Sequence, residues 1–516
     1  MLKNILPFVF LLSLTVSCVS VKRYNKRLEK PISPAAAKKD IDYAYQKLQQ
    51  LHPALYWYID ESELTGKFDS LKNSISEPIV PAELYQKIAP VIAQIREGHL
   101  RLVPPEKMLS RKELKKLENQ KGLLGRMNYV IDGDRIFVKD NVDHFEGIKV
   151  GTEILKIKDK SSKDYLEQYR KFVNSDGYNT TFQKYSLARR WPIFFTLENG
   201  ILDSVKIETR YLNETKTFYI HREKQTKKEK KEIKKQVATY KKDENKKTKD
   251  YNPIIRSFNR DLQYLGEDSS IAYMKIKSFS GTYSRKFYKK SFNELKNKNS
   301  QYLIIDVRDN LGGSLSEIQN LYSYLSSSKF TFINDIEVTS RKSMFHANYF
   351  SEFSPILQPF AVIAYPIYFI GTAISTKNKD GKIYLRNNNL FTSHQPKKNA
   401  FKGKIYVLIN GSSFSASSIL ASKLKNDHRA ILVGEETGGA NDGTVAGRYA
   451  TKKLPNSKII LPIGLMKIQP NIIFTHTKKG VTPDITIVPT LRDILSKKDL
   501  QLKWVLEDID QTAPLP

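Results

Sequence analysis

A strand–turn–helix pattern between residues 406 and 424 constrains the fold more than any other feature of this 516-residue chain. The apolar run 406–409 breaks at Asn410-Gly411 and enters a turn of small residues. Apolar residues then recur at helical spacing: Ala416, Ile419, Leu420 and Leu424. Such a turn can present a serine hydroxyl at a helix N-terminus, where the dipole and free N–H groups favour developing negative charge. Taken alone, serines in such a place are more often turn and N-cap residues.

Strands and helices alternate through the second half of the chain. The predicted strands cover 271–276, 302–307, 406–409 and 430–433, and the predicted helices cover 282–295, 314–325 and 416–425. This alternation favours a parallel or mixed sheet covered by helices. We therefore expect an α/β domain over 255–495, with an irregular insertion at 335–400 and a tail at 496–516.

The first hundred residues predict helices. Amphipathic patterns at 35–51, 62–75 and 82–96 predict an N-terminal helical domain over 35–105, which follows a polar tether at 19–34. Pro90 lies inside the third pattern, and we expect a kink or a break there. Gly98 ends this helix, and His99 follows it directly, ahead of a strand-like segment at 100–103. A histidine in such a place is most often a loop residue without a role, unless other residues give it one.

A different pattern fills the region 120–221. Short strands are predicted at 129–131, 135–138 and 152–157, and a helix at 162–172. Strands, a glycine-bearing loop and a helix suggest a small module that binds an extended peptide by adding it to a sheet edge. The segment 222–250 is rich in Lys and Glu and has few apolar residues, so we interpret it as a solvated helix or a disordered linker.

The N-terminus resembles a bacterial lipoprotein signal. A short positive start precedes an apolar run at 5–14, and Ser17-Cys18 follows it. The apolar run is too short to span a membrane. We expect a signal peptide over 1–18 and lipidation of Cys18, which would anchor the protein to a membrane of the bacterial cell envelope, facing the periplasm or the exterior. An ordinary secretory signal with an incidental cysteine is the alternative.

Charge and residue counts exclude several functional classes. The formal net charge is +31, but the basic residues are scattered outside the linker and form no nucleic-acid motif, so we expect no nucleic-acid partner. Cys18 is the only cysteine, which excludes a disulfide framework and a cysteine metal cluster. The eight histidines have no paired ligand spacing. We therefore expect neither a metal nor a cofactor.

The segment Asp306-Val307-Arg308-Asp309-Asn310-Leu311-Gly312-Gly313 leaves a predicted buried strand and enters a predicted helix. Its paired glycines allow backbone N–H groups to approach a ligand closely, as an oxyanion hole requires. It lacks the lysine and the spacing of a phosphate-binding loop. A plain glycine turn before a helix is the equal alternative from this segment alone.

Together these segments resemble the serine peptidase family of the C-terminal processing (tail-specific) proteases and tricorn. The resemblance is carried, in the family's order, by Asp306-x-Arg308-x-Asn310-x-Gly312-Gly313, by Ser413-Phe414-Ser415-Ala416, by Gly434-Glu435-Glu436-Thr437-Gly438-Gly439 and by Gly480-Val481-Thr482-Pro483-Asp484. It covers nearly everything after the signal. It implies a helical N-terminal domain, a PDZ-like module and a crotonase-like (ClpP/crotonase) α/β catalytic domain.

The resemblance also implies a set of catalytic residues. Ser415 would be the nucleophile, with an oxyanion hole formed by the N–H of Ala416 and that of Gly312 or Gly313. The processing proteases use a lysine base after the Gly-Glu-x-Thr motif, but the segment 438–443 has none. The tricorn-like branch uses a histidine from the first domain, which matches His99 and suits a general base near neutral pH.

Two departures from the family pattern concern the third catalytic group. The branch places a glutamate shortly before the Gly-Val-x-Pro-Asp motif, where this chain has no carboxylate, and Ser418 replaces the glutamate usual three residues after the nucleophile. Glu435, Glu436 and Asp442 are therefore candidates for the orienting carboxylate.

The resemblance predicts an exported serine endopeptidase that acts on peptide or protein substrates through an acyl-enzyme. A catalytically impaired homologue that binds peptides or cell-envelope ligands is the alternative. Acyl-CoA chemistry on a similar fold is less favoured, because export removes the protein from cytoplasmic CoA.

Overall fold

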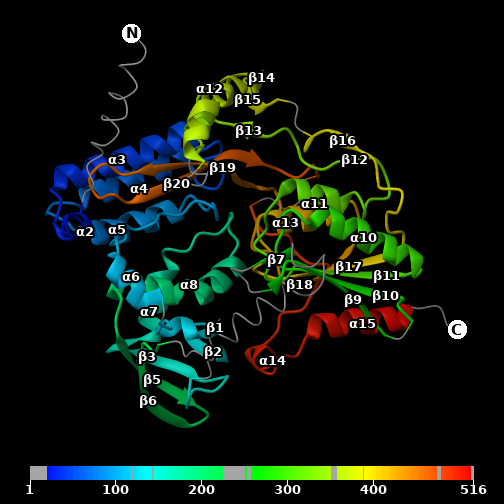
Figure 1. The fold of residues 1–516 in the computed structure, drawn as a ribbon, viewed down its shortest axis with the longest axis horizontal. Helices are drawn as coiled ribbons and strands as arrows, with labels where there is room; N and C mark the ends of the chain where they lie inside the picture. The colour runs from blue at the N-terminus through cyan, green and yellow to red at the C-terminus, as the bar shows by residue number, and fades with distance from the viewer. Residues whose placement is uncertain are drawn as a thin grey trace.

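The computed structural model describes residues 20–118, 120–141, 145–224, 250–252, 257–266, 268–349, 357–386, 389–473 and 478–512. Three larger sheets and their helices build a multidomain α/β protein, as the sequence predicts (Figure 1). The predicted signal peptide, Cys18 and most of the predicted linker at 222–250 lie outside the described residues. No helix in the described ranges has the length and apolar character needed to cross a bilayer.

A six-stranded sheet forms the centre of the C-terminal half. Its order is β21 (Ile485–Thr486), β18 (Ile431–Gly434), β17 (Lys404–Ile409), β11 (Tyr302–Asp306), β10 (Ile271–Ile276) and β9 (Arg260–Leu265). The pairs are parallel except that β9 runs antiparallel to β10. Because β11 and β17 are parallel neighbours, the loops that follow them meet at the same edge of the sheet, where ligands of such sheets usually bind.

Helices cover both faces of this sheet. Alternate strand residues enter two different cores, because successive side chains of a strand point to opposite faces. Leu303, Ile305 and Val407 join the main core with α10 (Ser284–Asn297), α11 (Leu315–Tyr322) and α13 (Ala416–Asn426). The opposite face, which includes Ile304, Tyr406 and Leu408, packs against Val505 and Ile509 of α15 (Leu500–Thr512). The predicted tail at 496–516 therefore contains a helix that covers the sheet.

The N-terminal helices share the main core with the C-terminal half. They are α3 (Pro34–Leu51), α4 (Glu61–Asn73) and α5 (Pro81–Ala93). Strands β19 (Thr444–Lys453) and β20 (Ile460–Ile468) form a hairpin, and α3 packs on β20. Asp40 of α3 is fully buried and accepts hydrogen bonds from the N–H groups of Asn456 and Ser457, at 2.9 and 2.6 Å. This carboxylate fastens the first domain to the hairpin that leads toward the site.

Removing this carboxylate is expected to destabilise the fold. Asp40→Ala leaves the buried Ser457 N–H without its acceptor, and we expect a loss of about 3 kcal/mol in the free energy of unfolding. Asp42→Ala, two residues along the same helix, removes an exposed partner of Lys72 and should cost less than about 0.5 kcal/mol. Urea unfolding followed by circular dichroism measures both, and equal midpoints for the two variants would contradict the expectation.

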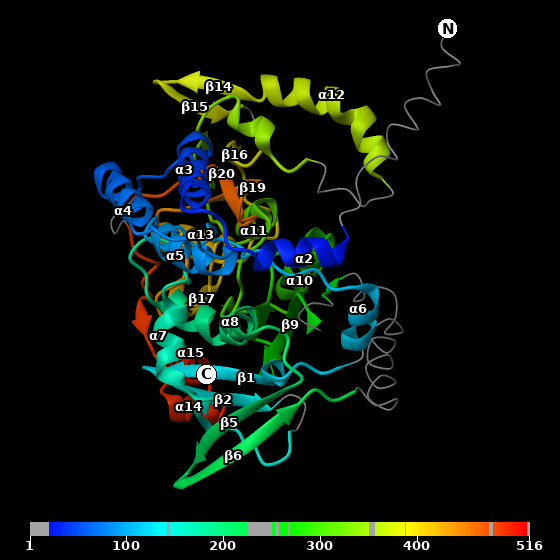
Figure 2. The same cartoon turned by 90° about the vertical axis from the view of Figure 1, so that its left-hand side faces the viewer.

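The middle of the chain forms a separate β module with its own core. The sheet order is β1 (Met127–Asp132), β2 (Arg135–Asn141), β3 (Glu153–Ile157), β5 (Ser204–Tyr211) and β6 (Glu214–His221), and β4 (Lys160–Ser161) pairs with β3. Helices α7 (Ser162–Arg170) and α8 (Thr181–Asn199) pack on it, with Trp191 buried in its core. Figure 2 shows this module at the opposite end of the molecule from α12 (Gln358–Ile374).

The structure differs from several predicted elements. The expected tether at 19–34 contains helix α2 (Val21–Glu29), which is capped by the Ser20 hydroxyl and buries Leu28. Helix α5 contains Pro90 and ends at Ala93, before the predicted end at 96. Only Val103 of the strand expected at 100–103 pairs with another residue, Ile460.

The insertion at 335–400 is more regular than predicted. It contributes α12 and the strands β13 (Glu337–Val338), β14 (Thr376–Lys379) and β15 (Lys382–Leu385), and these strands extend the β19–β20 hairpin into a five-stranded sheet. Short strands with polar residues gave no clear period-2 signal, and the pairing partner β20 lies far away in the sequence. Helices α6 (Arg111–Glu118) and α8 were also not predicted.

Candidate active site

Ser415 lies on a strained turn between β17 and α13. Its φ of 57° and ψ of −118° are unusual for a residue with a side chain, and they coincide with the N-cap position of α13. Such a sharp strand-to-helix turn projects the hydroxyl out of the backbone, as a nucleophile requires. Phe414 and Ser415 pack so closely on Gly312 that a Cβ at Gly312 would lie 2.7 Å from the Phe414 carbonyl oxygen.

His99 reaches this turn from the N-terminal domain. Its Nε2 lies 3.1 Å from the Ser415 Oγ, which is hydrogen-bond distance. The imidazole stacks on Phe414 at a centroid distance of 4.7 Å, and Phe414 stacks in turn on Phe182 at 4.3 Å. A Cβ at Gly98 would lie 2.6 Å from the Phe414 ring, so a larger residue here would displace that ring. The structure therefore brings together two residues that are 316 positions apart.

A hydroxyl and a carboxylate hold the other side of the imidazole. The His99 Nδ1 lies 2.9 Å from the Thr444 Oγ1, and the Thr444 hydroxyl donates to the Glu97 Oε1 at 2.8 Å. The direct distance between the His99 Nδ1 and the Glu97 Oε1 is 3.8 Å. If Nδ1 carries the ring proton, it donates to Thr444, and Nε2 is left to accept the proton of Ser415.

Burial shifts the pKa values of His99, Glu97 and Asp176. It lowers the pKa of the His99 imidazole, and the Arg101 cation lowers it further, while Asp176 opposes the change. The imidazole is therefore neutral near pH 7, as a general base must be. Burial raises the pKa of the Glu97 carboxyl to about 7, although hydrogen bonds from Asp176, Val445 and Thr444 oppose the rise. Burial and the neighbouring Glu97 raise the pKa of Asp176 well above its usual range, so Asp176 carries the proton that the two acids share.

The loop after β11 supplies backbone N–H groups beside Ser415. The N–H of Gly312 donates to the Asn310 Oδ1 at 2.9 Å, and the Gly312 carbonyl accepts from the Phe279 N–H at 3.0 Å. Because the C=O and N–H of a trans peptide point in opposite directions, the Gly313 N–H points away from Phe279. Among the described residues, neither this N–H nor that of Ala416 has a hydrogen-bond acceptor. These two donors fit an oxyanion hole better than Gly312 does.

The hydroxyl groups of Ser417 and Ser418 hold the turn that carries Ser415. The Ser417 hydroxyl donates to the Asn310 carbonyl at 2.8 Å, and the Ser418 hydroxyl donates to the Ser413 carbonyl at 2.9 Å. Ser418 also accepts from the Gly439 N–H at 3.1 Å. The serine that replaces the family's glutamate thus ties the turn to the Gly438-Gly439 loop.

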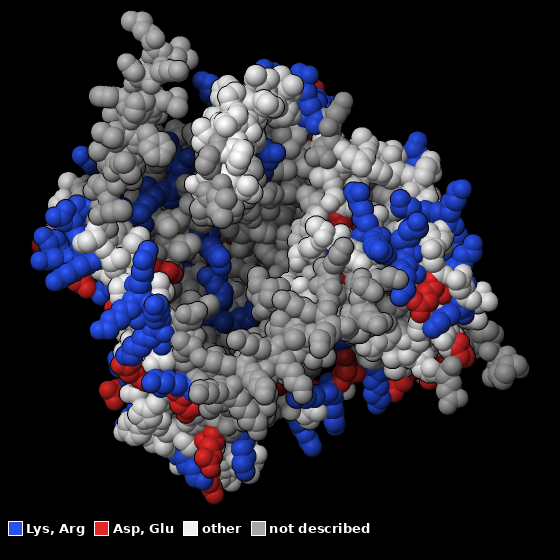
Figure 3. All heavy atoms as spheres, in the orientation of Figure 1, with Lys and Arg blue, Asp and Glu red and all other residues white. Residues whose placement is uncertain are grey.

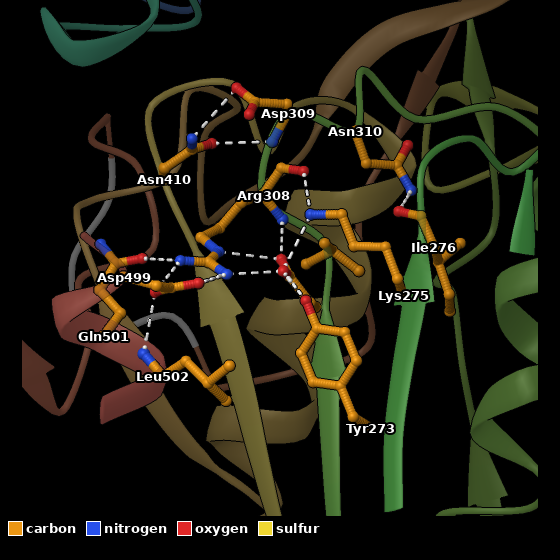
Figure 4. Close-up of polar contacts among 12 residues, drawn as sticks. Tyr273, Lys275, Ile276, Arg308, Asp309, Asn310, Asn410, Asp499, Gln501 and Leu502 are labelled. Atoms are coloured by element: carbon orange, nitrogen blue, oxygen red, sulfur yellow. Dashed lines mark hydrogen bonds and ion pairs between the residues drawn. The ribbon is translucent and has the colours of Figure 1, made fainter. Parts of the chain in front are cut away.

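A buried ionic network anchors the loop after β11 (Figure 4). Asp306 is 1% exposed and binds both the Arg308 guanidinium, at 2.7 Å, and the Lys275 ammonium, at 2.9 Å. Arg308 reaches across to Asp499 at the start of α15, again at 2.7 Å. The positive charges of Lys275 and Arg308 outweigh the effect of burial and lower the pKa of Asp306 to about 2. The network fixes the course of the loop that carries Gly312 and Gly313.

The predicted orienting carboxylates contact other groups. Glu435 accepts from the Tyr185 hydroxyl, Glu436 accepts from the Asn179 amide at 3.1 Å, and Asp442 accepts from the Tyr58 hydroxyl at 3.4 Å. None of the three forms a hydrogen bond or an ion pair with His99 in the described part of the chain, so the structure does not bring them to the imidazole. Glu97 holds the position instead.

Glu97 was missed because the family pattern places this carboxylate after the nucleophile. Glu97 lies only two residues before His99, but this spacing alone cannot show that its carboxylate approaches the imidazole. Thr444 lies 345 residues from His99, and only the folded β19 brings it there.

The carboxylates of Glu97 and Asp176 and the imidazole of His99 place their donor atoms within 4.8 Å of one another, which could suit a cation. Their oxygens, however, already accept protein hydrogen bonds. Thr444 and Val445 donate to Glu97, and Gly98 donates to Asp176 at 2.7 Å. These contacts fit an imidazole support better than a metal centre.

Comparison with known proteins agrees with this geometry. Residues 270–487 match the description "Peptidase family S41". These residues form an S41 peptidase domain. The match supports a serine-type peptidase, as the motifs within this segment predict. A search of curated protein sequences finds no match.

Two solved structures of CPAF share the fold of most of this chain at low sequence identity. Mature CPAF is 15% identical with a TM-score of 0.58, and the match covers 94% of this chain and 99% of that one. Mature CPAF in complex with lactacystin has a TM-score of 0.59 at 15% identity, covering 93% of this chain and 98% of that one. The photosystem II D1 C-terminal processing protease also aligns, at 15% identity over 89% of this chain and 96% of that one, with a TM-score of 0.40. The similarity to CPAF extends the shared fold beyond the S41 domain to the N-terminal helices and the β module.

Proposed function

We propose that this S41 peptidase is an endopeptidase that hydrolyses peptide bonds through an acyl-enzyme on Ser415, with His99 as the general base. The observation that carries the proposal is the 3.1 Å distance between the Ser415 Oγ and the His99 Nε2. The strained φ of Ser415 and the neutral imidazole support the same roles.

Each residue has a defined part in the proposed reaction. The Ser415 Oγ attacks the substrate carbonyl while its proton moves to the His99 Nε2, and the N–H groups of Ala416 and Gly313 stabilise the oxyanion. The intermediate collapses when His99 gives that proton to the leaving amine. Water then hydrolyses the acyl-enzyme, again with His99 as base. Glu97, acting through the Thr444 hydroxyl, stabilises the imidazolium that forms in each half of the reaction.

The pH dependence of kcat/KM should reflect the ionisation of the Glu97 carboxyl. Its folded-state pKa is raised to about 7, so the carboxylate that stabilises the imidazolium forms only as the pH rises through that value. The lowered pKa of His99 keeps the imidazole neutral throughout this range. We therefore expect kcat/KM to rise with a midpoint near pH 7 and to level off above it. In Glu97→Gln the midpoint should fall below 6.5, the ordinary pKa of histidine, and an unchanged midpoint would contradict this assignment.

A fluorophosphonate probe tests the nucleophile directly. We expect covalent labelling of the natural chain at Ser415, and loss of labelling in Ser415→Ala. Ser413→Ala is the matched control, because Ser413 lies in the same turn but its buried hydroxyl donates to the Val307 carbonyl. A natural chain that binds peptides but neither labels nor cleaves them would favour the alternative, a catalytically impaired binding protein.

We also propose that the protein is exported and anchored through a lipid on Cys18, with the β module acting as a PDZ-like substrate-binding domain. The sequence Leu14-Thr15-Val16-Ser17-Cys18 supports the anchor. The edge position of β1 supports strand addition by an extended peptide. Cys18→Ser should move the protein from the membrane fraction to the soluble fraction after cell lysis, and an unchanged distribution would contradict the lipid anchor.

A further inference from the structure

Three arginines, Arg101, Arg189 and Arg190, lie near the candidate active site without a carboxylate partner; we call them the arginine cluster. Arg101 follows His99 by two residues and is exposed. Arg189 and Arg190 are neighbours on α8. Within the described residues, none of the three forms an ion pair. Arg189 is also exposed and Arg190 is half-buried, so the guanidinium groups are accessible to a ligand.

The contacts of the cluster fix its location. The Arg189 Nη1 donates to the Ser412 Oγ at 2.6 Å, three residues before the nucleophile. The Arg190 guanidinium lies 4.9 Å from the centre of the Phe194 ring, which supports its cationic plane without neutralising it. Asp309 attracts Arg189, but its carboxylate accepts from the Asn410 amide at 3.2 Å. Arg189 and Arg190 are therefore in contact with neutral groups, and neither forms an ion pair with a carboxylate in the described structure.

Mutual repulsion within the cluster is evident from its electrostatics. Burial, Arg101 and Arg189 together lower the pKa of Arg190 to about 10. Arg101 also lowers the pKa of His99, so its charge acts on the catalytic imidazole. Figure 3 shows one face of the molecule hollowed below α12, with basic side chains along the wall of the hollow. A concave surface with one sign of charge concentrates ligands of the opposite sign.

We propose that the arginine cluster binds acidic side chains of the peptide substrate and so directs this peptidase to acidic sequences. Successive residues of an α-helix point about 100° apart, so Arg189 and Arg190 serve two different positions along a bound peptide. Arg189 is directed to the serine turn, whereas the charge of Arg190 interacts with that of Arg101. A single terminal carboxylate could engage only one of these positions, which favours a peptide with at least two acidic side chains. Guanidinium groups bind carboxylates through paired hydrogen bonds.

This inference rests on the proposed function, and a binding measurement separates the two. Ser415→Ala binds substrate without cleaving it, so fluorescence anisotropy can compare three labelled peptides on that variant. The first carries two glutamates and an amidated C-terminus, the second replaces both glutamates with glutamine, and the third is the glutamine peptide with a free C-terminal carboxylate. We expect the glutamate peptide to bind about 10-fold more tightly than the second peptide, and the advantage to decrease with added salt.

Single substitutions assign the effect to the cluster. Arg101→Gln and Arg190→Gln, each in the Ser415→Ala background, should remove most of the advantage of the glutamate peptide. Arg101→Gln changes an exposed side chain, so a folding defect is not expected. Lys289→Gln removes an exposed positive charge from α10, outside the β module, and should leave the advantage unchanged.

Equal affinity for the glutamate and glutamine peptides would overturn the inference, even if the natural chain cleaves both. A preference for the free C-terminal carboxylate alone would also overturn it. If the natural chain cleaves no peptide and resists the fluorophosphonate probe, while Ser415→Ala keeps its preference for glutamate, the proposed chemistry fails and the acidic specificity stands.

Discussion

Replacing His99 with alanine is expected to lower kcat/KM by about 10⁴-fold to 10⁶-fold, because it removes the proposed acceptor of the Ser415 proton. In the described structure the Ser415 hydroxyl has one side-chain partner, the His99 Nε2 at 3.1 Å. The loss should appear in kcat, since the imidazole acts on the proton in transit and does not hold the substrate. Hydrolysis of a quenched fluorescent peptide measures it, with peptide affinity taken from Ser415→Ala.

The control for this variant is His221→Ala. His221 is exposed at the end of β6, in the β module, and its loss should leave kcat/KM within about 2-fold of the natural chain. His99→Ala also removes the ring that stacks on Phe414, so folding has to be checked by thermal unfolding. A folded His99→Ala variant with full activity would refute the base assignment and leave Ser415 to be activated by another group.

The proposed catalytic pair could be selected from the sequence because each residue lies beside a local signal. Ser415 follows a strand and begins a helix, and His99 follows a glycine that ends one. The main strands of the central sheet were predicted because buried parallel strands are continuous apolar runs, as 302–306 is. Their order was set by long-range pairing, such as that of β11 with β17, which no local pattern contains.

The residues that hold the His99 imidazole could not be predicted, because they come from separate domains that meet only in the folded structure. Asp176 lies in the β module region, Glu97 in the N-terminal domain and Thr444 in the C-terminal hairpin, yet their side chains meet around His99. Small polar residues of this kind have no periodic signal. The insertion was misjudged for a similar reason, since β13 has only two residues and is a strand only through its partners β15 and β20.

The Thr444 hydroxyl offers the sharpest test of how the histidine is held. Thr444→Val keeps the shape of the side chain but removes the group that accepts from the His99 Nδ1 and donates to the Glu97 Oε1. The ring would then lose both its fixed tautomer and its link to the negative charge. We expect kcat to fall by about 10²-fold to 10⁴-fold, with little change in KM, because loss of an orienting partner can cost up to that amount in a serine triad.

Two further variants separate orientation from packing. Thr444→Ser retains the hydroxyl and should recover most of the rate, even though it lacks the methyl group. Glu97→Gln should lower kcat to a similar extent as Thr444→Val, and the double variant should be no slower than either single one, because both act through one connection to His99. If Thr444→Val instead keeps full activity and only Glu97→Gln is impaired, the 3.8 Å approach of Glu97 to the imidazole acts directly and the hydroxyl is dispensable.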